Sequence, residues 1–170
     1  MTCGITGTPG TGKSVVSGVL QSRGYQVIRQ NDTMEPFLTG RDEERDARIV
    51  DADAWADRYT PTAPFIEGHL VHLLAVDRIV VLRCRPDRLS VRLESRGYSA
   101  EKIRENCEAE AMDLILSEAY DIHGEENLLE IDTTDRSPED CADLIEGFVN
   151  GTVPPSCGSI DWSTMLGDLL

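Results

Sequence analysis

Residues 7–14 read GTPGTGKS and follow the apolar residues CGIT at positions 3–6. Gly7, Gly12 and the pair Lys13–Ser14 fit the phosphate-binding loop pattern G-x-x-x-x-G-K-[ST]. In this pattern backbone N–H groups surround phosphates, the lysine reaches the β and γ oxygens and the hydroxyl meets Mg²⁺. Residues 13–23 predict a helix whose positive N-terminal end faces the anion. The stretch therefore predicts a nucleotide site, and a chance turn rich in glycine and threonine is the alternative.

Length and charge limit what the chain can be. Its 170 residues suffice for one domain with a buried core and are few for two. The formal net charge of −15 opposes a broad nucleic-acid-binding face, because phosphate backbones repel an acidic surface. Only Lys13 and Lys102 are lysines among 16 basic residues, a bias that resembles proteins of salt-loving archaea. An ordinary acidic protein is the alternative.

Cysteine usage and hydropathy bear on the compartment. Five cysteines are scattered through the chain without a C-x-x-C pair, which favours reduced thiols over a disulfide framework. No apolar run is long enough to cross a bilayer, and the N-terminal residues lack the regions of a secretion signal. We therefore expect a soluble, cytoplasmic protein without membrane contact.

Short β-rich runs alternate with helical runs along the chain. The β-rich runs lie at residues 3–6, 25–29, 63–69, 78–84 and 127–131. Right-handed βαβ crossovers bring such strands into one parallel sheet. The run at 78–84 is almost continuously apolar, as expected for a central strand covered on both faces. The sequence thus predicts an α/β fold of the P-loop kinase type, with a five-stranded parallel sheet flanked by helices.

Two segments depart from this rhythm. Residues 31–59 are polar and charged, and fit either an insertion that covers a substrate or a solvated acidic excursion. Residues 85–122 predict two helices separated by Gly97 and Tyr98, with Ser99 as the N-cap of the second. Two helices of this kind beside a phosphate-binding loop are typical of a lid.

The C-terminal part of the chain predicts a helix and a tail. Residues 137–148 predict a helix with Ser137 as its N-cap. The tail, residues 151–170, begins with turn-forming residues and ends with apolar side chains near helical spacing. We expect the tail to dock on the domain itself, and a partner-binding motif is the alternative.

Four motifs, taken in order, resemble one family. They are the phosphate-binding loop, FIEGH at 65–69, VLR at 81–83 and RLESRGYSAEKIRENCEAE at 92–110. Together they resemble the adenylate kinase 6 family, also called the coilin-interacting nuclear ATPase family, in its archaeal form. The resemblance covers about residues 1–148, and its most specific stretch is the last of the four.

The resemblance implies a fold and an activity. The fold is a single nucleoside monophosphate (NMP) kinase domain at 1–150, with an NMP-binding part at about 29–52 and a lid at about 95–105. The implied activities are phosphoryl transfer from ATP to AMP-like acceptors and ATP hydrolysis. The implied partner is a basic platform protein of the small ribosomal subunit, contacted during maturation of that subunit.

The resemblance also implies site residues. The ATP-binding loop is matched by Gly10, Gly12, Lys13, Ser14 and Val15. Arg96 matches a lid arginine that contacts ATP. Glu67 and His69 fall where the family has an acidic residue and a histidine two positions apart. The implied cofactors are ATP and Mg²⁺.

The residues themselves indicate the same chemistry. Phosphoryl transfer requires positioning and positive charge, which Lys13, Mg²⁺ and Arg96 can supply. Glu67 follows an apolar run and is expected at the carboxyl edge of the sheet, where it can hold a Mg²⁺-bound water beside the Ser14 hydroxyl. His69 is expected to orient the attacking water or the phosphates. The catalytic candidates are therefore Lys13, Glu67, His69 and Arg96, with Ser14 and Glu67 at the metal.

Several assignments stay open at this point. The candidates for the arginine that holds the acceptor phosphate are Arg41, Arg45, Arg48 and Arg83. Arg92 lies four residues before Arg96, and either joins it at the phosphates or pairs with a surface glutamate. His69 and His72 alone are a poor zinc set, and His72 is expected to be structural. An ATP-hydrolysing assembly switch and another small-molecule kinase are the alternative functions.

Overall fold

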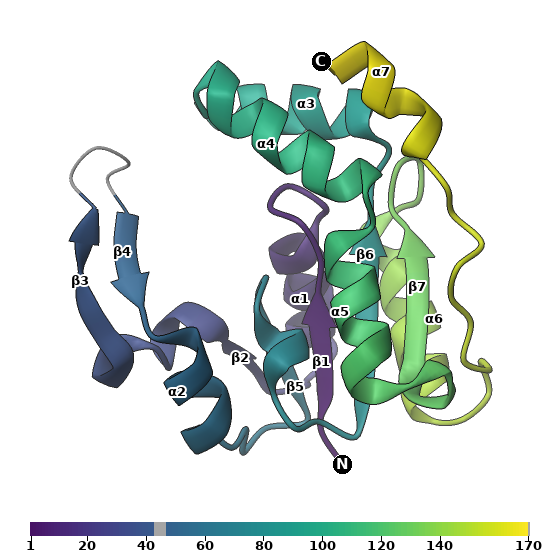
Figure 1. Cartoon of the computed structure of the whole chain (residues 1–170). Coiled ribbons are helices and arrows are strands. Elements are labelled where there is room, and N and C mark those ends of the chain that lie inside the picture. Colours follow the sequence, from purple (N-terminus) through teal and green to yellow (C-terminus); the bar gives the residue numbers. More distant parts are fainter. Residues whose placement is uncertain (43–46, 170) are drawn as a thin grey trace.

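The computed structural model describes residues 1–42 and 47–169, and the candidate Arg45 lies outside them (Figure 1). The main sheet has five parallel strands in the order β2-β5-β1-β6-β7, which confirms the predicted fold class. These strands are β1 (Cys3–Thr6), β2 (Val27–Arg29), β5 (Phe65–Glu67), β6 (Arg78–Arg83) and β7 (Leu128–Asp132).

Strand β6 is an interior strand with buried side chains on both faces. Ile79 and Val81 belong to one apolar cluster, and Val80 and Leu82 belong to the other. This alternation follows from the two-residue period of a strand. It explains why an almost continuous apolar run predicts a strand covered by helices on both sides.

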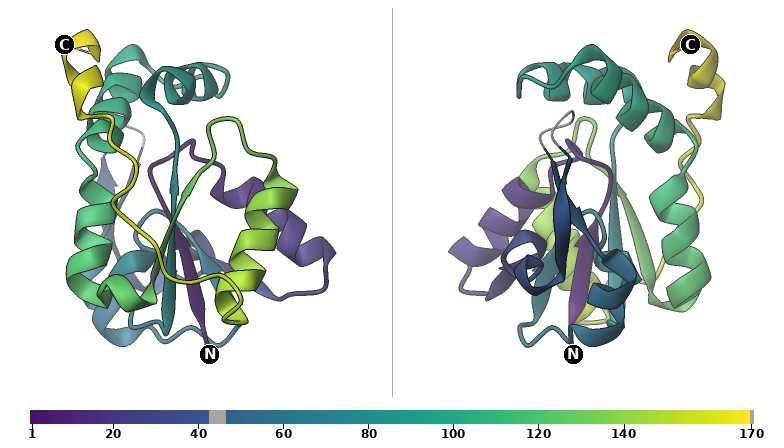
Figure 2. Two further views of the ribbon diagram at one scale, coloured as in Figure 1. Left: turned by 90° about the vertical axis from the view of Figure 1, so that its right-hand side faces the viewer. Right: turned by 60° about the vertical axis from the view of Figure 1, so that its left-hand side comes forward.

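Two pairs of helices cover the two faces of the sheet (Figure 2). One pair is α1 (Lys13–Ser22) and α6 (Pro138–Val149), and the other is α2 (Ala52–Arg58) and α5 (Leu114–His123). Leu20 and Ile145 bury the first pair against the sheet, and Trp55 and Leu116 bury the second. The 3-10 helices are η1 (Gln30–Asp32), η2 (Glu35–Phe37), η3 (Val71–Leu73), η4 (Glu125–Asn127) and η5 (Ser163–Met165).

The segment at 85–122 forms three helices, so the prediction of two was wrong. They are α3 (Pro86–Glu94), α4 (Ala100–Ala111) and α5. Gly97 has a positive φ of 76° in the turn after α3, and Ser99 caps α4 by accepting a hydrogen bond from the Lys102 N–H at 3.3 Å. The chain turns again at Asp113, whose φ is 55° and whose carboxylate pairs with Arg83. This turn directs α5 away from α4 and onto the sheet.

Residues 31–59 carry more structure than their polar sequence indicates. An antiparallel hairpin of β3 (Leu38–Asp42) and β4 (Ala47–Val50) stands beside the main sheet (Figure 1). Trp55 of α2 is fully buried, and its indole N–H donates to Thr33 Oγ1 at 2.9 Å. The hairpin is exposed while α2 belongs to the core, so a solvated excursion describes only part of the segment.

The C-terminal tail runs back along the domain. Ser156 forms a parallel bridge to β7, where its carbonyl oxygen accepts a hydrogen bond from the Glu130 N–H at 2.8 Å. The Trp162 ring lies over the Arg83 guanidinium, with 5.1 Å between the ring centroid and Cζ. Helix α7 (Leu166–Leu169) contacts α4. Within residues 1–42 and 47–169, none of the helices has the length and apolar character to cross a membrane.

Candidate nucleotide site

The phosphate-binding loop joins β1 to α1 at the carboxyl edge of the sheet. Gly7 has a φ of +142°, and a Cβ there would lie 2.3 Å from the Leu82 carbonyl oxygen, so only glycine fits. Gly12 has a φ of 106° and immediately precedes Lys13, the first residue of α1. The N-terminus of α1 therefore lies at the loop, where its dipole favours an anion.

A cavity of about 610 Å³ lies over this loop. Its walls come from the loop, from the ends of β2 and β5, from the hairpin and from the turn before α4. The predicted site residues in its wall are Gly10, Gly12, Lys13, Ser14, Glu67, His69 and Arg96. Val15 lies outside this cavity and lines an adjacent pocket of about 220 Å³, which also touches Arg92, Arg96 and Thr133.

Lys13 is half-buried and folds back over the loop. Its Nζ donates to the carbonyl oxygens of Gly7 at 2.6 Å and Thr8 at 3.0 Å. Burial lowers the pKa of Lys13 to about 8, while the carboxylates of Glu67 and Glu110 oppose this shift. The ammonium therefore remains largely protonated at pH 7 and supplies positive charge inside the loop.

Glu67 and Ser14 form the oxygen-rich side of the cavity. Glu67 is the last residue of β5 and is buried, and its Oε1 accepts a hydrogen bond from Ser14 Oγ at 3.5 Å. Burial raises the pKa of the Glu67 carboxyl, and the charges of Lys13 and Arg29 partly oppose it. A hydroxyl beside a carboxylate fits Mg²⁺, which prefers oxygen ligands and completes its shell with water and phosphate oxygens. The described residues contain no group of three or more His, Cys, Asp or Glu side chains suited to a metal.

His69 lies two residues after Glu67 in the wall of the cavity and is oriented by Gln30. Gln30 is buried, and its Nε2 lies 3.5 Å from His69 Nδ1 while its Oε1 accepts a hydrogen bond from the Leu70 N–H at 2.7 Å. A Cβ on Gly68 would lie 2.2 Å from Gln30 Oε1, so glycine is required there. Desolvation by the cavity wall, with the charge of Lys13, lowers the pKa of His69 to about 4. The imidazole is therefore neutral at pH 7 and can accept a proton.

Other lining residues have no role assigned from the sequence, although they fall within the NMP-binding part and the lid that the resemblance implies. Among them are Arg29 and Gln30 at the end of β2, and Tyr98 and Lys102 near the start of α4. Apart from the resemblance, the only signal for the first two is their position at the carboxyl end of a predicted strand, where ligands bind in open α/β folds.

Two of the candidate arginines for the acceptor phosphate, Arg48 and Arg83, differ in whether they line the cavity. Arg48 of β4 lines the cavity and also a neighbouring pocket of about 750 Å³. Arg83 was a wrong candidate: it is 1% exposed, and its guanidinium pairs with Glu110, Asp113 and Glu130. A buried guanidinium with three carboxylate partners has no surface left for a substrate phosphate.

Arg92 and Arg96 take different directions despite their spacing of four. Arg92 donates to the carbonyl oxygens of Thr133 at 2.8 Å and Thr134 at 3.2 Å, so the predicted surface glutamate partner was wrong. These carbonyls lie in the loop after β7, which Arg92 ties to α3. Arg96 follows α3, is exposed, and lines both the large cavity and the adjacent pocket.

His72 is buried between β1 and α5 and does not line the cavity. Its Nδ1 lies 3.1 Å from Thr6 Oγ1, and its Nε2 lies 2.8 Å from Glu118 Oε2. Burial lowers the pKa of His72, and Glu118 partly restores it. These contacts join β1, η3 and α5, so His72 has a structural role.

The chain matches known protein sequences over almost its full length. A family model described as "AAA domain" matches residues 3–113. A protein of Natronomonas pharaonis named "Putative adenylate kinase" is 44% identical over 98% of this chain and 100% of its own length. A protein of the same name from Methanothermobacter thermautotrophicus is 41% identical over 95% of this chain and 97% of its own length.

Solved structures share the fold at much lower identity. Deoxyadenosine kinase from M. mycoides with bound dATP superposes with a TM-score of 0.56 at 15% identity, covering 88% of this chain and 100% of that chain. A gluconokinase from Sinorhizobium meliloti superposes with a TM-score of 0.55 at 16% identity, covering 89% and 93%. These structures support a P-loop kinase fold. By its sequence matches, the chain belongs to the archaeal family whose members carry the name "Putative adenylate kinase".

Proposed function

We propose that this protein transfers the γ-phosphoryl group of ATP to an AMP-like nucleoside monophosphate. The observation that carries the proposal is the single cavity in which Lys13, Glu67 and Arg96 meet Arg48 of the hairpin. The first three suit a nucleoside triphosphate with Mg²⁺, and Arg48 suits a second phosphate opposite them. The name of the relatives points to the same reaction.

In the donor half of the site, the chemistry of the side chains suggests which residues bind each part of ATP. The loop and the Lys13 ammonium bind the β and γ phosphates, while Ser14 and Glu67 would hold Mg²⁺ and one of its waters. Bound Mg²⁺ neutralises charge on the phosphate oxygens. The adjacent pocket between the loop, Arg92 and Thr133 suits the base of ATP, because it opens on the same loop and has apolar side chains such as Val15. Arg96 faces both spaces and can neutralise charge on the transferred group.

The acceptor half is formed by the hairpin and the end of β2. Arg48 and Arg29 supply positive charge, and the neighbouring pocket next to Arg48 has room for a nucleoside between Met34, Leu38 and Val50. In the reaction an oxygen of the acceptor phosphate attacks the γ-phosphorus, and the bond from that phosphorus to the β–γ bridging oxygen breaks. Two nucleoside diphosphates leave.

ATP hydrolysis is the second activity that we propose, and His69 is the residue that supports it. Water is a weaker nucleophile than a phosphate oxygen, so it needs orientation and a proton acceptor. A neutral imidazole held by Gln30 in the wall of the cavity meets both needs. We therefore assign His69 to the water reaction and Arg96 to both reactions.

Three further expectations stay predictions. Cysteine usage and hydropathy predict a cytoplasmic location, and the acidic, lysine-poor composition predicts adaptation to high salt. The resemblance implies a contact with a basic platform protein during maturation of the small ribosomal subunit. The net charge of −15 favours a basic partner, because opposite charges accelerate and orient association. Co-purification of small-subunit proteins with the tagged protein at moderate salt tests this contact, and its absence would contradict it.

The kinase assignment is tested with a panel of nucleoside monophosphates. Each labelled monophosphate is incubated with ATP and Mg²⁺, and the labelled diphosphate is measured. We expect AMP to be converted fastest, with a Lys13→Ala sample as the control for contaminating kinases. Conversion of none of the monophosphates, with ATP bound normally, would overturn the kinase proposal.

A further inference from the structure

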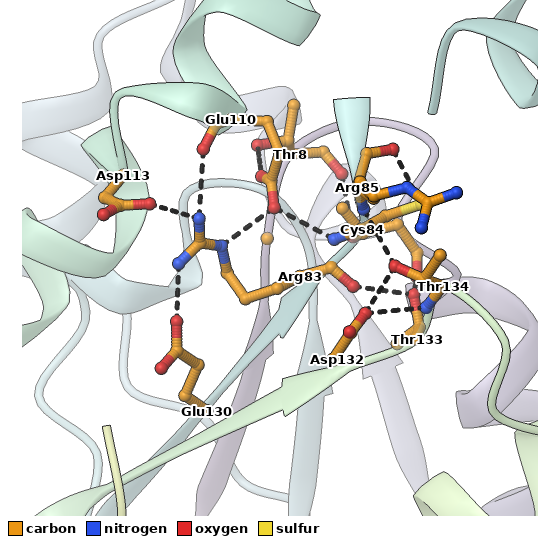
Figure 3. Close-up of polar contacts among 12 residues, drawn as sticks. Thr8, Arg83, Cys84, Arg85, Glu110, Asp113, Glu130, Asp132, Thr133 and Thr134 are labelled. Atoms are coloured by element: carbon orange, nitrogen blue, oxygen red, sulfur yellow. Dashed lines mark hydrogen bonds and ion pairs between the residues drawn. The ribbon is translucent and has the colours of Figure 1, made fainter. Parts of the chain in front are cut away.

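The Glu110 carboxylate lies against Thr8 of the phosphate-binding loop although it comes from helix α4 (Figure 3). The residue is 3% exposed. Its Oε2 accepts a hydrogen bond from Thr8 Oγ1 at 2.5 Å. Its Oε1 accepts from Arg83 Nε at 2.8 Å and from the Cys84 N–H at 3.0 Å. One side chain of α4 thus contacts both the loop and strand β6.

A carboxylate at this depth is stable only if its donors stay in place. Burial penalises a charged group unless partners compensate, and here the compensation comes from a guanidinium, a hydroxyl and a backbone N–H. Arg83 cannot serve Glu110 alone, because Nη1 also donates to Glu130 Oε1 at 2.5 Å and Nη2 also pairs with Asp113 (Figure 3). Three carboxylates share one guanidinium, so the Thr8 hydroxyl is a needed donor.

Thr8 lies where the loop holds its lysine. The Thr8 carbonyl oxygen accepts from Lys13 Nζ at 3.0 Å and from Thr11 Oγ1 at 2.9 Å. The side chain of the same residue is fixed by Glu110. Displacement of Thr8 would therefore move the backbone oxygen that orients Lys13.

The same carboxylate fixes the base of the lid. Glu110 lies in the last turn of α4, and its backbone carbonyl oxygen accepts from Arg83 Nη2 at 3.0 Å. The other end of α4 follows the turn that carries Arg96 and bears Lys102, and both of these residues line the cavity. One end of α4 is thus anchored at the loop, and the other end faces the nucleotide.

The tail covers the network from the outside. The Gly158 N–H donates to Glu130 Oε2 at 2.8 Å, and Trp162 lies over the Arg83 guanidinium. Exclusion of water strengthens charged hydrogen bonds, so this cover makes the links of Arg83 and Glu110 more rigid.

We propose that Glu110 is a positioning residue that holds the phosphate-binding loop and the base of lid helix α4 in one fixed arrangement. Through Thr8 it keeps the loop in the shape that binds ATP phosphates. Through Arg83 and its own backbone it keeps α4 anchored while the far end of the helix moves. Binding of ATP at the loop should therefore also reduce local opening at the base of α4. The inference rests on the proposed binding of ATP at the loop, and it does not depend on the acceptor.

Thr8→Val tests this link, because valine has the shape of threonine without its hydroxyl. We expect the Kd and the KM for ATP to rise on the order of tenfold, because a buried carboxylate loses one donor and the loop loosens. The KM for AMP should stay within about twofold of wild type, and Thr8→Ser should restore ATP affinity because it keeps the hydroxyl. Cys107→Ala is the matched control: it removes a buried contact between α4 and α3 without touching the loop, so it should lower Tm and leave the Kd for ATP unchanged.

Hydrogen exchange on the wild-type protein gives a second test that needs no variant. ATP should slow exchange of the backbone amides at 107–112, which lie outside the wall of the cavity. Unchanged exchange at these amides with ATP bound would overturn the inference, as would a folded Thr8→Val protein with wild-type ATP affinity. Failure of the wild-type protein to bind ATP would overturn the proposed function as well, whereas failure to phosphorylate AMP would leave this inference intact.

Discussion

The two walls of the nucleotide cavity are built differently. On the loop side, Thr8 and Glu110 are buried and hydrogen-bonded to each other, and half-buried Lys13 is bonded to the loop itself. On the hairpin side, Leu38 is 36% exposed and Ile49 is 47% exposed. One wall is part of the core, and the other is a two-stranded extension from it.

The difference follows from what each wall must do. Backbone N–H groups bind phosphate well only if they are fixed in advance, since ordering them on binding would cost affinity. An acceptor that must enter and leave requires a wall that can move aside. The buried contacts of the donor wall fit a preorganised phosphate site, and the exposed hairpin fits the acceptor side of the proposed reaction.

The largest effect is expected from Lys13→Ala in the donor wall. Both ATP hydrolysis and AMP phosphorylation should fall by orders of magnitude, because a preorganised cation at the β and γ phosphates is lost. Initial rates of ADP formation with and without AMP measure this. Near-normal turnover in a folded variant would remove the donor wall from the mechanism.

Variants of Arg96 and His69 should affect ATP hydrolysis and AMP phosphorylation differently. Arg96→Ala should lower both rates, on the order of a thousandfold, because the arginine neutralises the transferred group whichever nucleophile attacks. His69→Ala should lower hydrolysis on the order of a hundredfold and AMP phosphorylation much less. Two initial rates per variant at saturating ATP and Mg²⁺ measure the split. Equal reduction of both rates by His69→Ala would mean that His69 is a shared contact and not a water-orienting group.

The hairpin wall is tested with Arg48→Ala. We expect the KM for AMP to rise on the order of tenfold with little change in the KM for ATP, because one charge-assisted contact to the acceptor phosphate is lost. Arg58→Ala is the control, since Arg58 lies at the end of α2 and outside the cavity wall. A rise in the KM for ATP alone would assign Arg48 to the donor wall and break the comparison.

The smallest effect concerns the support of the donor wall by His72. Its folded pKa is lowered by burial, so the unfolded chain binds a proton at higher pH than the folded protein does. Its contribution to stability is therefore full above the unfolded pKa of about 6.5 and declines as pH falls from there toward the folded value. The free energy of unfolding of wild type minus that of His72→Gln, from urea titrations at pH 8 and pH 5.5, should be larger at pH 8. A larger difference at pH 5.5 would mean that the buried imidazole is charged.

The sequence predicts the donor wall much better than the acceptor wall, for a physical reason. The loop, Glu67 and His69 belong to short motifs at strand ends, and strand ends of a parallel sheet meet at one edge. Arg29 and Gln30 also lie at the end of a predicted strand, but they belong to no short motif, and a polar residue after a strand has many uses.

Local sequence patterns also do not predict contacts between segments that are distant in the chain. Glu110 looks like a surface residue in an acidic helix, and Arg83 looks like an available cation at a strand end. Only the packing of α4 over the loop brings them together 2.8 Å apart and buries both. The turn at Asp113 was missed for the same reason, since the positive φ of this residue is stabilised by its pairing with Arg83.

In the proposed reaction the γ-phosphoryl group goes from the donor wall to an acceptor held by the hairpin wall. The most direct measurement follows the label of γ-labelled ATP in the presence of Mg²⁺, with AMP at increasing concentration. We expect the label to move from inorganic phosphate into ADP as AMP saturates, with the Arg48→Ala variant requiring more AMP for the same partition. Label that remains entirely in inorganic phosphate at every AMP concentration would contradict the claim and leave a nucleotide hydrolase.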